Sequence, residues 1–241
     1  MKRWVVFTTL TLVFLFGLNQ LWAQDITNNV GIGARFMWLG PQTDTYFDDK
    51  ADLEGKSMFG GTLAYGVSRW LSLEVAFDAS LKTDLEKVIG EEAGVEKLVK
   101  VADVRVYPLT FSGQLRYIAG PEFYTWIVPY ATFGFGRYFV DCDVAKEYKE
   151  YEVPPGVTKE VKTDVGDAWG GHLGGGFDIF VHKNIAFNFE FRYFWAESDI
   201  REETTIIYPD YIYSEKKSGE MDLDSWMVGV GIKFYFGLFG R

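Results

Sequence analysis

Hydrophobic and polar residues alternate with a period of two in eight stretches of the chain. In IAFNFEFRYFW, residues 185–195, apolar side chains fill every second position, while Asn188, Glu190 and Arg192 lie between them. Because a β-strand sends successive side chains to opposite faces, each stretch predicts a strand with one apolar and one polar face. The predicted strands are 30–39, 57–67, 70–79, 102–118, 126–140, 169–181, 185–196 and 226–236.

The connections between these predicted strands are alternately short and long. SR, AGPEFYT and HKN make the short ones, whereas the long ones occupy 40–56, 80–101, 141–168 and 197–225. An up-and-down arrangement places alternate connections at opposite ends, so one end has tight turns and the other has long loops. This layout is typical of outer-membrane barrels, whose turns are periplasmic and whose long loops are extracellular. We therefore predict an all-β fold, an eight-stranded antiparallel up-and-down transmembrane β-barrel.

The long loops are acidic, and two of them alternate further. EYKEYEVPPGVTKEVKT, residues 147–163, alternates around the Pro-Pro-Gly sequence at 154–156, and TTIIYPDYIYSE, residues 204–215, alternates around Pro209. Turn residues between two alternating runs predict a hairpin. Both loops are therefore expected to contain hairpins that extend past the membrane.

Period two alone does not decide which face of each strand points inward. Tryptophans cluster at predicted strand ends, as in the interfacial girdles of membrane barrels. The face opposite the apolar side carries glycines and other small residues, which suit the narrow interior of an eight-stranded barrel. We therefore expect the apolar face to contact lipid, and a soluble lipocalin-like barrel with an apolar interior remains the alternative. The tryptophans are Trp38, Trp70, Trp126, Trp169, Trp195 and Trp226.

The first residues predict an export signal. A basic start at Lys2 and Arg3 precedes an apolar segment over 4–18 and a cleavage point after Ala23. The apolar segment is shorter than the ~20 residues of a spanning helix, although an uncleaved anchor helix is the alternative. We expect residues 1–23 to be a cleaved Sec-type signal peptide and residues 24–241 to form one outer-membrane barrel domain.

Charge and cysteine content narrow the class of protein. The formal charge is −10, which argues against a nucleic-acid partner because such partners favour a basic face. Cys142 is the single cysteine of the sequence, so no internal disulfide is expected. It lies between two aspartates and is interpreted as an ordinary loop residue.

The segments YPLTFSGQLRY, VPYATFGFGRYF, GGHLGGGFDIFVHKNIAFNFEFRYFW and WMVGVGIKFYF resemble the OmpW-type family of small outer-membrane barrels. More loosely, they resemble the barrels of OmpA and OmpX. The resemblance covers 30–236 in layout and implies an eight-stranded barrel with both termini periplasmic. For the OmpW type it also implies a narrow, partly hydrophobic channel for small apolar molecules that opens sideways into the membrane. Such barrels end on an aromatic residue that the barrel-assembly machinery reads, and here either Phe236 or Phe239 has this place.

The polar face predicts a network of charges in the lumen. Isolated charges in a narrow, dry interior are costly, so they should be paired. Counted from the short turns, Glu74 falls at the depth of Arg116 and Glu190 at the depth of Lys233, which predicts two ion pairs. We interpret the network as a plug, and the alternative is that it lines a pore and selects ions. The inward polar residues are Arg35, Glu74, Asp78, Gln114, Arg116, His172, Asp178, Glu190, Arg192 and Lys233.

Pro108 interrupts the predicted strand 102–118. Proline removes a ladder donor and is confined in sheets to edges and bulges. Around it, Val104 and Val106 share parity with the polar residues Thr110 and Ser112. One interpretation is a bulge at the barrel rim. The other is a local gap between strands through which a hydrophobic solute leaves sideways, in keeping with the OmpW resemblance.

The two histidines do not predict an enzyme. A serine hydrolase needs a serine and an acid within reach of its histidine, yet Gly170 and Gly174 are the same-face neighbours of His172, and His182 lies in a predicted turn. No spacing matches a calcium loop or a zinc site. We therefore expect no catalytic residue, no metal and no cofactor.

Two functions remain open on the sequence. The first is a narrow channel or porter for small, in particular hydrophobic, solutes, with a tunnel lined by Tyr130, Tyr138, Phe194 and Met227. The second is a non-conducting structural or surface-interaction barrel whose acidic extracellular loops bind a partner. Either would reside in the outer membrane of a Gram-negative bacterium, contact outer-membrane lipid, and be assembled through its C-terminal strand. A monomer is favoured.

Overall fold

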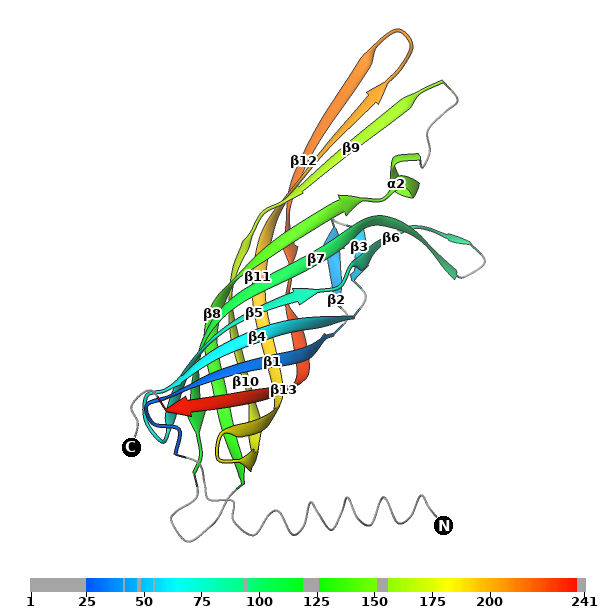
Figure 1. Ribbon diagram of the computed structural model, residues 1–241. Coiled ribbons are helices and arrows are strands. Elements are labelled where there is room, and N and C mark those ends of the chain that lie inside the picture. Colours follow the sequence, from blue (N-terminus) through cyan, green and yellow to red (C-terminus); the bar gives the residue numbers. More distant parts are fainter. Residues whose placement is uncertain are drawn as a thin grey trace, which may run out of the picture.

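The computed structural model describes residues 25–40, 42–46, 49–53, 55–92, 95–118, 126–150 and 156–237. The predicted signal peptide, the tail with Phe239, and Pro154 and Pro155 lie outside the described residues. Within the described parts, strands close into a barrel, and further strands continue from one of its ends (Figure 1).

Eight antiparallel strands form the barrel wall. They are β1 (Asn29–Leu39), β4 (Lys56–Gly66), β5 (Leu71–Ser80), β7 (Val95–Arg116), β8 (Ile127–Val144), β10 (Ala168–His182), β11 (Ile185–Ile207) and β13 (Ser225–Gly237). Around the wall the order is β1-β4-β5-β7-β8-β10-β11-β13, and β13 pairs again with β1. The predicted closed, eight-stranded antiparallel barrel is confirmed, and closure leaves no open edge in the wall.

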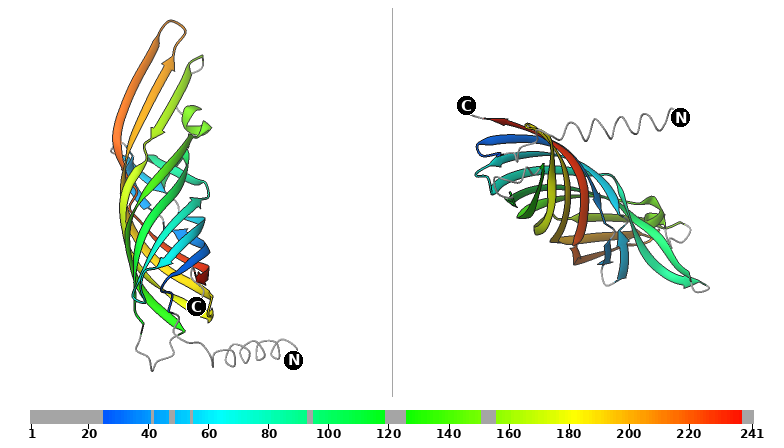
Figure 2. Two further views of the ribbon diagram at one scale, coloured as in Figure 1. Left: turned by 60° about the vertical axis from the view of Figure 1, so that its left-hand side comes forward. Right: turned by 90° about the horizontal axis from the view of Figure 1, so that it is seen from below.

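The described parts also contain five shorter strands and one short helix beyond the wall, at the end opposite the tight turns. β2 (Gln42–Tyr46), β3 (Asp49–Leu53) and β6 (Thr83–Glu92) form a ladder that continues onto the upper part of β7. β9 (Thr158–Val165) and β12 (Ile212–Asp222) pair with the upper part of β11. Figures 1 and 2 show β9, β12 and the upper part of β11 rising past the barrel as one projection, which we call the arm.

The two predicted loop hairpins have different outcomes. β11 and β12 form the hairpin expected at 204–215, with Ile207 opposite Ile212. The hairpin expected at 147–163 is wrong, because Lys146–Glu150 forms the helix α2 and β9 pairs with β11 instead. Lysine and glutamate favour helices, and the alternating reading of this segment overlooked that preference. None of the helices in the described residues has the length and apolar character needed to cross a membrane.

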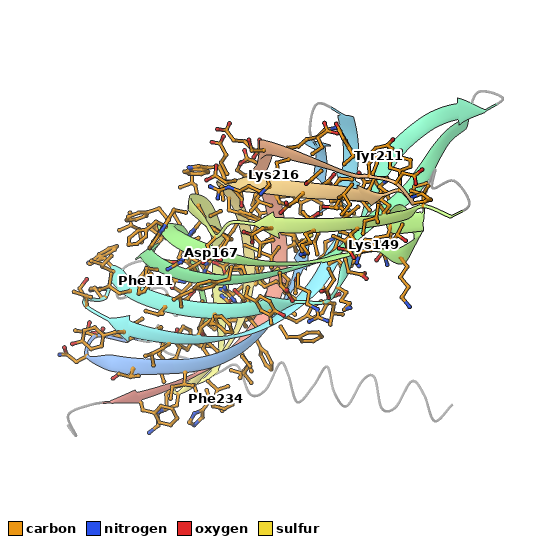
Figure 3. All side chains as sticks on the ribbon, turned by 90° about the horizontal axis from the view of Figure 1, so that it is seen from above. Phe111, Lys149, Asp167, Tyr211, Lys216 and Phe234 are labelled. Carbon is orange, nitrogen blue, oxygen red and sulfur yellow. The ribbon has the colours of Figure 1, made fainter. Side chains whose placement is uncertain are left out.

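Large apolar side chains cover the outer side of the barrel wall. On β5, Leu73 and Phe77 are exposed while Glu74 between them is buried. Figure 3 places Phe111 and Phe234 on the outside in the same way. A soluble barrel would hide these side chains, so the lipocalin-like alternative is wrong. Exposed apolar surface of this extent marks contact with a membrane.

The lumen is filled in three layers. A lower cluster near the tight turns and an upper cluster near the loops are both apolar, and polar side chains occupy the inward positions between them. The lower cluster consists of Ile26, Ile118, Val128, Phe180, Ala186 and Tyr235. The upper cluster includes Met37, Leu39, Met58, Val106, Tyr138, Phe194, Leu223 and Met227.

Candidate functional site

The middle layer of the lumen brings together the ten inward polar residues that the sequence singled out. Alternation along the strands turns each of them inside, and none is more than 5% exposed. Gln114 and His172 are neutral in this set. The other eight, four acids and four bases, carry no net formal charge, and we call them the charged belt. They are Arg35, Glu74, Asp78, Arg116, Asp178, Glu190, Arg192 and Lys233.

Glu74 on β5 is the centre of the charged belt. Its Oε1 accepts a hydrogen bond from Arg192 Nη2 at 2.7 Å, and its Oε2 accepts from Lys233 Nζ at 2.7 Å and from Gln114 Nε2 at 3.1 Å. Arg35 Nη1 lies 3.6 Å from the same carboxylate. Four strands besides β5 therefore meet at one buried carboxylate, which ties opposite sides of the wall together.

Two arginines connect Glu74 to two further acids of the charged belt, Glu190 and Asp78. Arg192 Nε donates to Glu190 Oε1 at 2.6 Å. Arg35 donates through Nε to Asp78 Oδ1 at 2.8 Å and lies 3.6 Å from Glu190. Charges this deeply buried are tolerable only when they are paired and hydrogen-bonded, and here the pairing is mutual.

A second group of the belt lies nearer the tight turns. Arg116 Nη1 donates to Asp178 Oδ2 at 2.7 Å. Asn188 Nδ2 donates to Asp178 Oδ1 at 3.0 Å and to the hydroxyl of Tyr130 at 2.7 Å. Arg116 lies over the ring of Phe180, which belongs to the lower cluster, so the polar layer ends against apolar side chains at this level.

The two ion pairs that the sequence predicted are wrong. Glu74 pairs with Arg192 and Lys233, and Arg116 pairs with Asp178. Glu190 pairs with Arg192 rather than Lys233. The prediction matched residues by depth on neighbouring strands, whereas long side chains in a narrow lumen reach across it to strands on the other side.

Sequence reasoning missed a partner of His172. Ser112 Oγ on β7 lies 2.9 Å from His172 Nε2 on β10, and Arg192 Nη1 donates to Ser112 Oγ at 3.4 Å. Gly134 on the intervening strand leaves the space for this contact, because a Cβ there would lie 2.7 Å from His172 Cε1. Ser112 is 60 residues from His172, so only a search for inward serines two strands away would have found it.

This serine–histidine pair lacks the third member of a hydrolytic triad. His172 Nδ1 has no hydrogen-bond partner among the described residues, whereas a triad needs an acid there to orient the ring. In the same described parts, no group of three or more histidine, cysteine, aspartate or glutamate side chains is placed to hold a metal ion.

A small apolar chamber lies in the upper cluster, on the loop side of the charged belt. Its volume is about 10 Å³, which is room for about one water molecule. Of the four residues proposed to line a tunnel, Phe194 and Met227 border this chamber, and the rings of Tyr138 and Phe194 stack at 5.1 Å. The lumen is therefore packed at this level. The chamber is lined by Leu39, Met58, Val106, Pro108, Phe194, Leu223 and Met227.

Pro108 is the point where β7 stops pairing with β5. The β5–β7 ladder ends at the pair of Phe77 and Leu109, and pairing on this edge of β7 resumes with β6 only at Val104. Between these points Val106 N–H donates to the side-chain hydroxyl of Ser80 at 2.8 Å.

The other edge of β7 runs through the proline undisturbed. Pro108 lies opposite Tyr138 on β8, and the register shows no shift from Ala102 to Arg116. A bulge at Pro108 is therefore absent on this side, and Val104, Val106 and Thr110 all turn inward. The positions that looked irregular in the sequence form one unbroken inward face of β7. This face is apolar on the loop side of Pro108 and polar on the tight-turn side.

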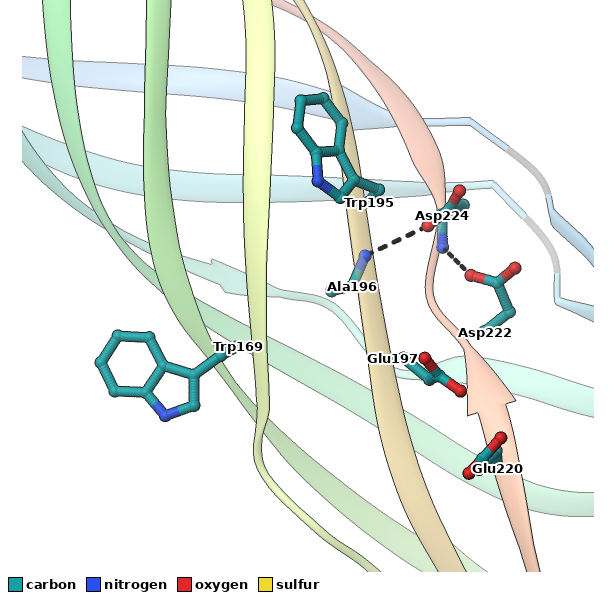
Figure 4. A pocket seen from close by; sticks show the side chains of 7 residues that line it. All are labelled: Trp169, Trp195, Ala196, Glu197, Glu220, Asp222 and Asp224. Carbon is teal, nitrogen blue, oxygen red and sulfur yellow. Dashed lines mark hydrogen bonds between the residues drawn. The ribbon is translucent and has the colours of Figure 1, made fainter.

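A groove of about 570 Å³ lies on the outer face at the rim, where β12 turns into β13 (Figure 4). Asp224 accepts a hydrogen bond from Ala196 N–H at 3.1 Å, and Asp222 accepts one from Asp224 N–H at 3.0 Å, so these carboxylates brace the turn. The pKa of Glu197 is raised by its hydrogen bond with Glu220 and by the charge of that neighbour. The groove is lined by Trp169, Trp195, Ala196, Glu197, Glu220, Asp222 and Asp224.

Comparison with known proteins places this geometry among outer-membrane barrels. The family model of the outer membrane protein beta-barrel domain matches residues 8–234. The crystal structure of the outer membrane protein OprG from Pseudomonas aeruginosa is 19% identical with a TM-score of 0.60, over 89% of this chain and 99% of that chain. The solid-state NMR structure of outer membrane protein AlkL in DMPC bilayers is 17% identical with a TM-score of 0.51, over 89% and 93%. No match is found among curated proteins.

Proposed function

Because the chain belongs to the outer membrane protein beta-barrel family, we propose that it acts in the outer membrane of a Gram-negative bacterium as a narrow porter for small apolar solutes. The proposed route enters from the loop end, passes the apolar chamber and leaves sideways between β5 and β7. Export would use the predicted signal peptide at 1–23.

One coincidence on β7 carries this proposal. Pro108 borders the apolar chamber on the inside, and the β5–β7 ladder ends beside it at Leu109. Proline has no N–H to offer a neighbouring strand. A stretch of wall without ladder hydrogen bonds is the least costly place for two strands to separate, and here that stretch borders the apolar chamber.

The charged belt supports a sideways exit over an axial one. Its eight charges balance and are buried in mutual pairs beneath the chamber. An apolar solute passing along the axis would have to break these pairs, and a buried charge that loses its partner costs about 3–5 kcal/mol. The belt therefore acts as the floor of the route and as the barrier to ions.

The proposal is tested by replacing Pro108 with valine. Valine restores an N–H at this position, so the β5–β7 ladder can continue past Leu109 and close the gap. We expect Pro108→Val to slow the uptake of naphthalene several-fold in vesicles whose outer leaflet is lipopolysaccharide, while the barrel still shows heat-modifiable migration on a gel.

The matched control is Pro129→Val. Pro129 lies on β8, near the tight turns and away from the chamber, so its replacement should leave uptake unchanged. Equal uptake by the wild-type protein and Pro108→Val would refute a sideways route at this site. If the wild-type protein, Pro108→Val and Pro129→Val all give the uptake of empty vesicles, the porter is refuted.

The arm favours a second candidate function, the binding of a partner at the cell surface. Tyr211, Ile212 and Tyr213 near its tip are exposed, Ile212 to 69%. The arm continues beyond the wall, since β11 pairs with β10 only as far as Glu197. Deleting 201–218 should therefore preserve the barrel. Unchanged solute uptake in this variant would assign the arm a role separate from transport, and lost uptake would make the arm part of the route.

A further inference from the structure

Ser80, the last residue of β5, lies beyond the point where β5 and β7 stop pairing. The final pair of their ladder joins Phe77 to Leu109, and the same register carried further along both strands would set Ser80 opposite Val106. That backbone pair is absent, and Val106 N–H donates instead to Ser80 Oγ at 2.8 Å. A side chain therefore takes the place that the main chain of β5 holds in the rest of the ladder.

The hydrogen bond between Ser80 and Val106 is buried and easily reversed. Both residues are 7% exposed, so little water reaches the N–H, and a buried N–H without a partner is costly. The bond therefore holds the two strands together while it lasts. It depends on one side-chain torsion, however, and rotation of Ser80 from one staggered position to another releases Val106 without a shift of either backbone.

The same hydrogen bond lies beside the apolar chamber. Val106 lines the chamber, and the backbone partner of Ser80 on β4 is Met58, which also lines it. Pro108 borders the chamber as well and offers no N–H to β5. Beyond the proline, β5 is thus fastened to β7 at the level of the chamber by a side chain.

We propose, on the basis of the porter function above, that Ser80 is a positioning residue for the sideways route and acts as its latch. While its hydroxyl accepts from Val106 N–H, β5 and β7 stay together beyond Pro108. Solute leaves sideways only in states in which this bond is broken and the strands have separated. The strength of one hydrogen bond therefore sets how often the route is open and how fast solute passes.

Ser80→Ala removes the acceptor and tests the latch. Alanine leaves Val106 N–H unpaired in the closed wall and changes little in the open one, so it shifts the population toward open states. We expect naphthalene uptake into the vesicles described above to rise about two- to tenfold, as the loss of one hydrogen bond allows.

The matched control is Ser72→Ala on the same strand. The buried hydroxyl of Ser72 donates to Gln114 Oε1 at 3.2 Å, and the two residues are paired inside the intact β5–β7 ladder. This change also removes one buried serine hydroxyl from the inward face of β5, but away from the gap. Its uptake should equal that of the wild-type protein.

A reversible cross-link gives a second measurement, made on one and the same protein. Ser80→Cys and Val106→Cys are combined with Cys142→Ser, which removes the single native cysteine. Oxidation should fasten the gap and slow uptake several-fold, and dithiothreitol should restore the rate. Val75→Cys with Phe111→Cys in the same background is the matched cross-link, because these residues lie opposite each other in the intact ladder. Its oxidation should leave uptake unchanged.

The outcomes separate the latch from the porter. Wild-type uptake above that of empty vesicles, together with an unchanged or slower rate in Ser80→Ala, would overturn the latch and leave the porter standing. Wild-type uptake equal to that of empty vesicles would overturn both. If Ser80→Ala does not fold, the cross-link decides, since an oxidised gap that passes naphthalene as fast as the reduced one also overturns the latch.

Discussion

At the scale of single residues, Glu74 explains how a narrow barrel can hold charges in its core. It accepts from Arg192, Lys233 and Gln114 and lies near Arg35, so each buried cation around it has an oxygen to meet. No other carboxylate among the described residues shares its position between three basic side chains.

Glu74→Gln should destabilise the barrel strongly, because it leaves buried cations without their shared anion. We expect a loss of about 3–5 kcal/mol in the free energy of unfolding, measured by urea titration in lipid vesicles with the folded fraction read from gel migration. The control is Glu203→Gln on the arm, whose pair with Lys216 at 3.2 Å is largely exposed. That change should cost no more than about 1 kcal/mol, and an equal loss in both variants would contradict the role of the belt.

Gly134→Ala should also destabilise the barrel, by about 1–3 kcal/mol as in other overpacked cores. The added Cβ would clash first with the backbone oxygen of Phe111 on β7, and it would also lie 2.7 Å from His172 Cε1 and push the ring away from Ser112. Gly61→Ala is the matched control, since the nearest atom to its Cβ is a carbonyl oxygen at 3.6 Å. The same unfolding titration checks both, and a silent Gly134→Ala would contradict the close packing of β8 against Phe111 and His172 at this position.

Single residues also show where sequence reasoning stops. The inward position of all ten polar residues follows from parity along the strands, which is a local property. Their partners do not, because Glu74 and Lys233 are 159 residues apart and meet across the lumen. Which acid meets which base depends on strand tilt and side-chain length, and neither can be read from depth along a strand.

At the scale of elements, we expect the rim turn between β12 and β13 to respond to pH. The folded-state pKa of Glu197 is raised by Glu220, so this group stabilises the rim at low pH and loses that contribution as the pH rises through its folded pKa. We therefore expect Glu197→Gln to slow amide hydrogen exchange around Ala196 and Leu223 at pH 7 and to change nothing near pH 3.

The matched control for Glu197 is Glu160→Gln on β9, which is exposed and lies on a different strand of the arm. Its exchange rates at the rim should equal those of the wild-type protein at both pH values. Slower exchange in Glu197→Gln at both pH values would show that the effect comes from the amide side chain rather than from relief of repulsion.

Elements were predictable where a pattern repeats and unpredictable where pairing is long-range. The eight wall strands follow from their alternation, and the hairpin of β11 and β12 follows from its central turn. The pairing of β9 with β11 brings 158–165 against 200–207, and no local signal marks those segments as neighbours. The short helix α2 forms because lysine and glutamate favour helices, although the alternating pattern of this segment predicted a strand.

At the scale of the whole molecule, the barrel is an apolar shell around a polar core. The exposed apolar wall and the paired charges inside are consequences of one alternation seen from its two sides. The upper and lower clusters close the polar layer at both ends. This architecture is the basis of the sideways route that we propose for apolar solutes near the loop end and of the barrier to ions that we expect along the axis.

Planar-bilayer recording of the purified barrel tests the sealed lumen most directly. The belt of paired charges, held between two apolar clusters, predicts a flat baseline with no large steady conductance in concentrated potassium chloride. Glu74→Gln, if it inserts, should add brief openings, because it releases buried cations from their shared carboxylate. A large and steady ohmic conductance in the wild-type protein would contradict the sealed axis and would make the barrel an ion pore.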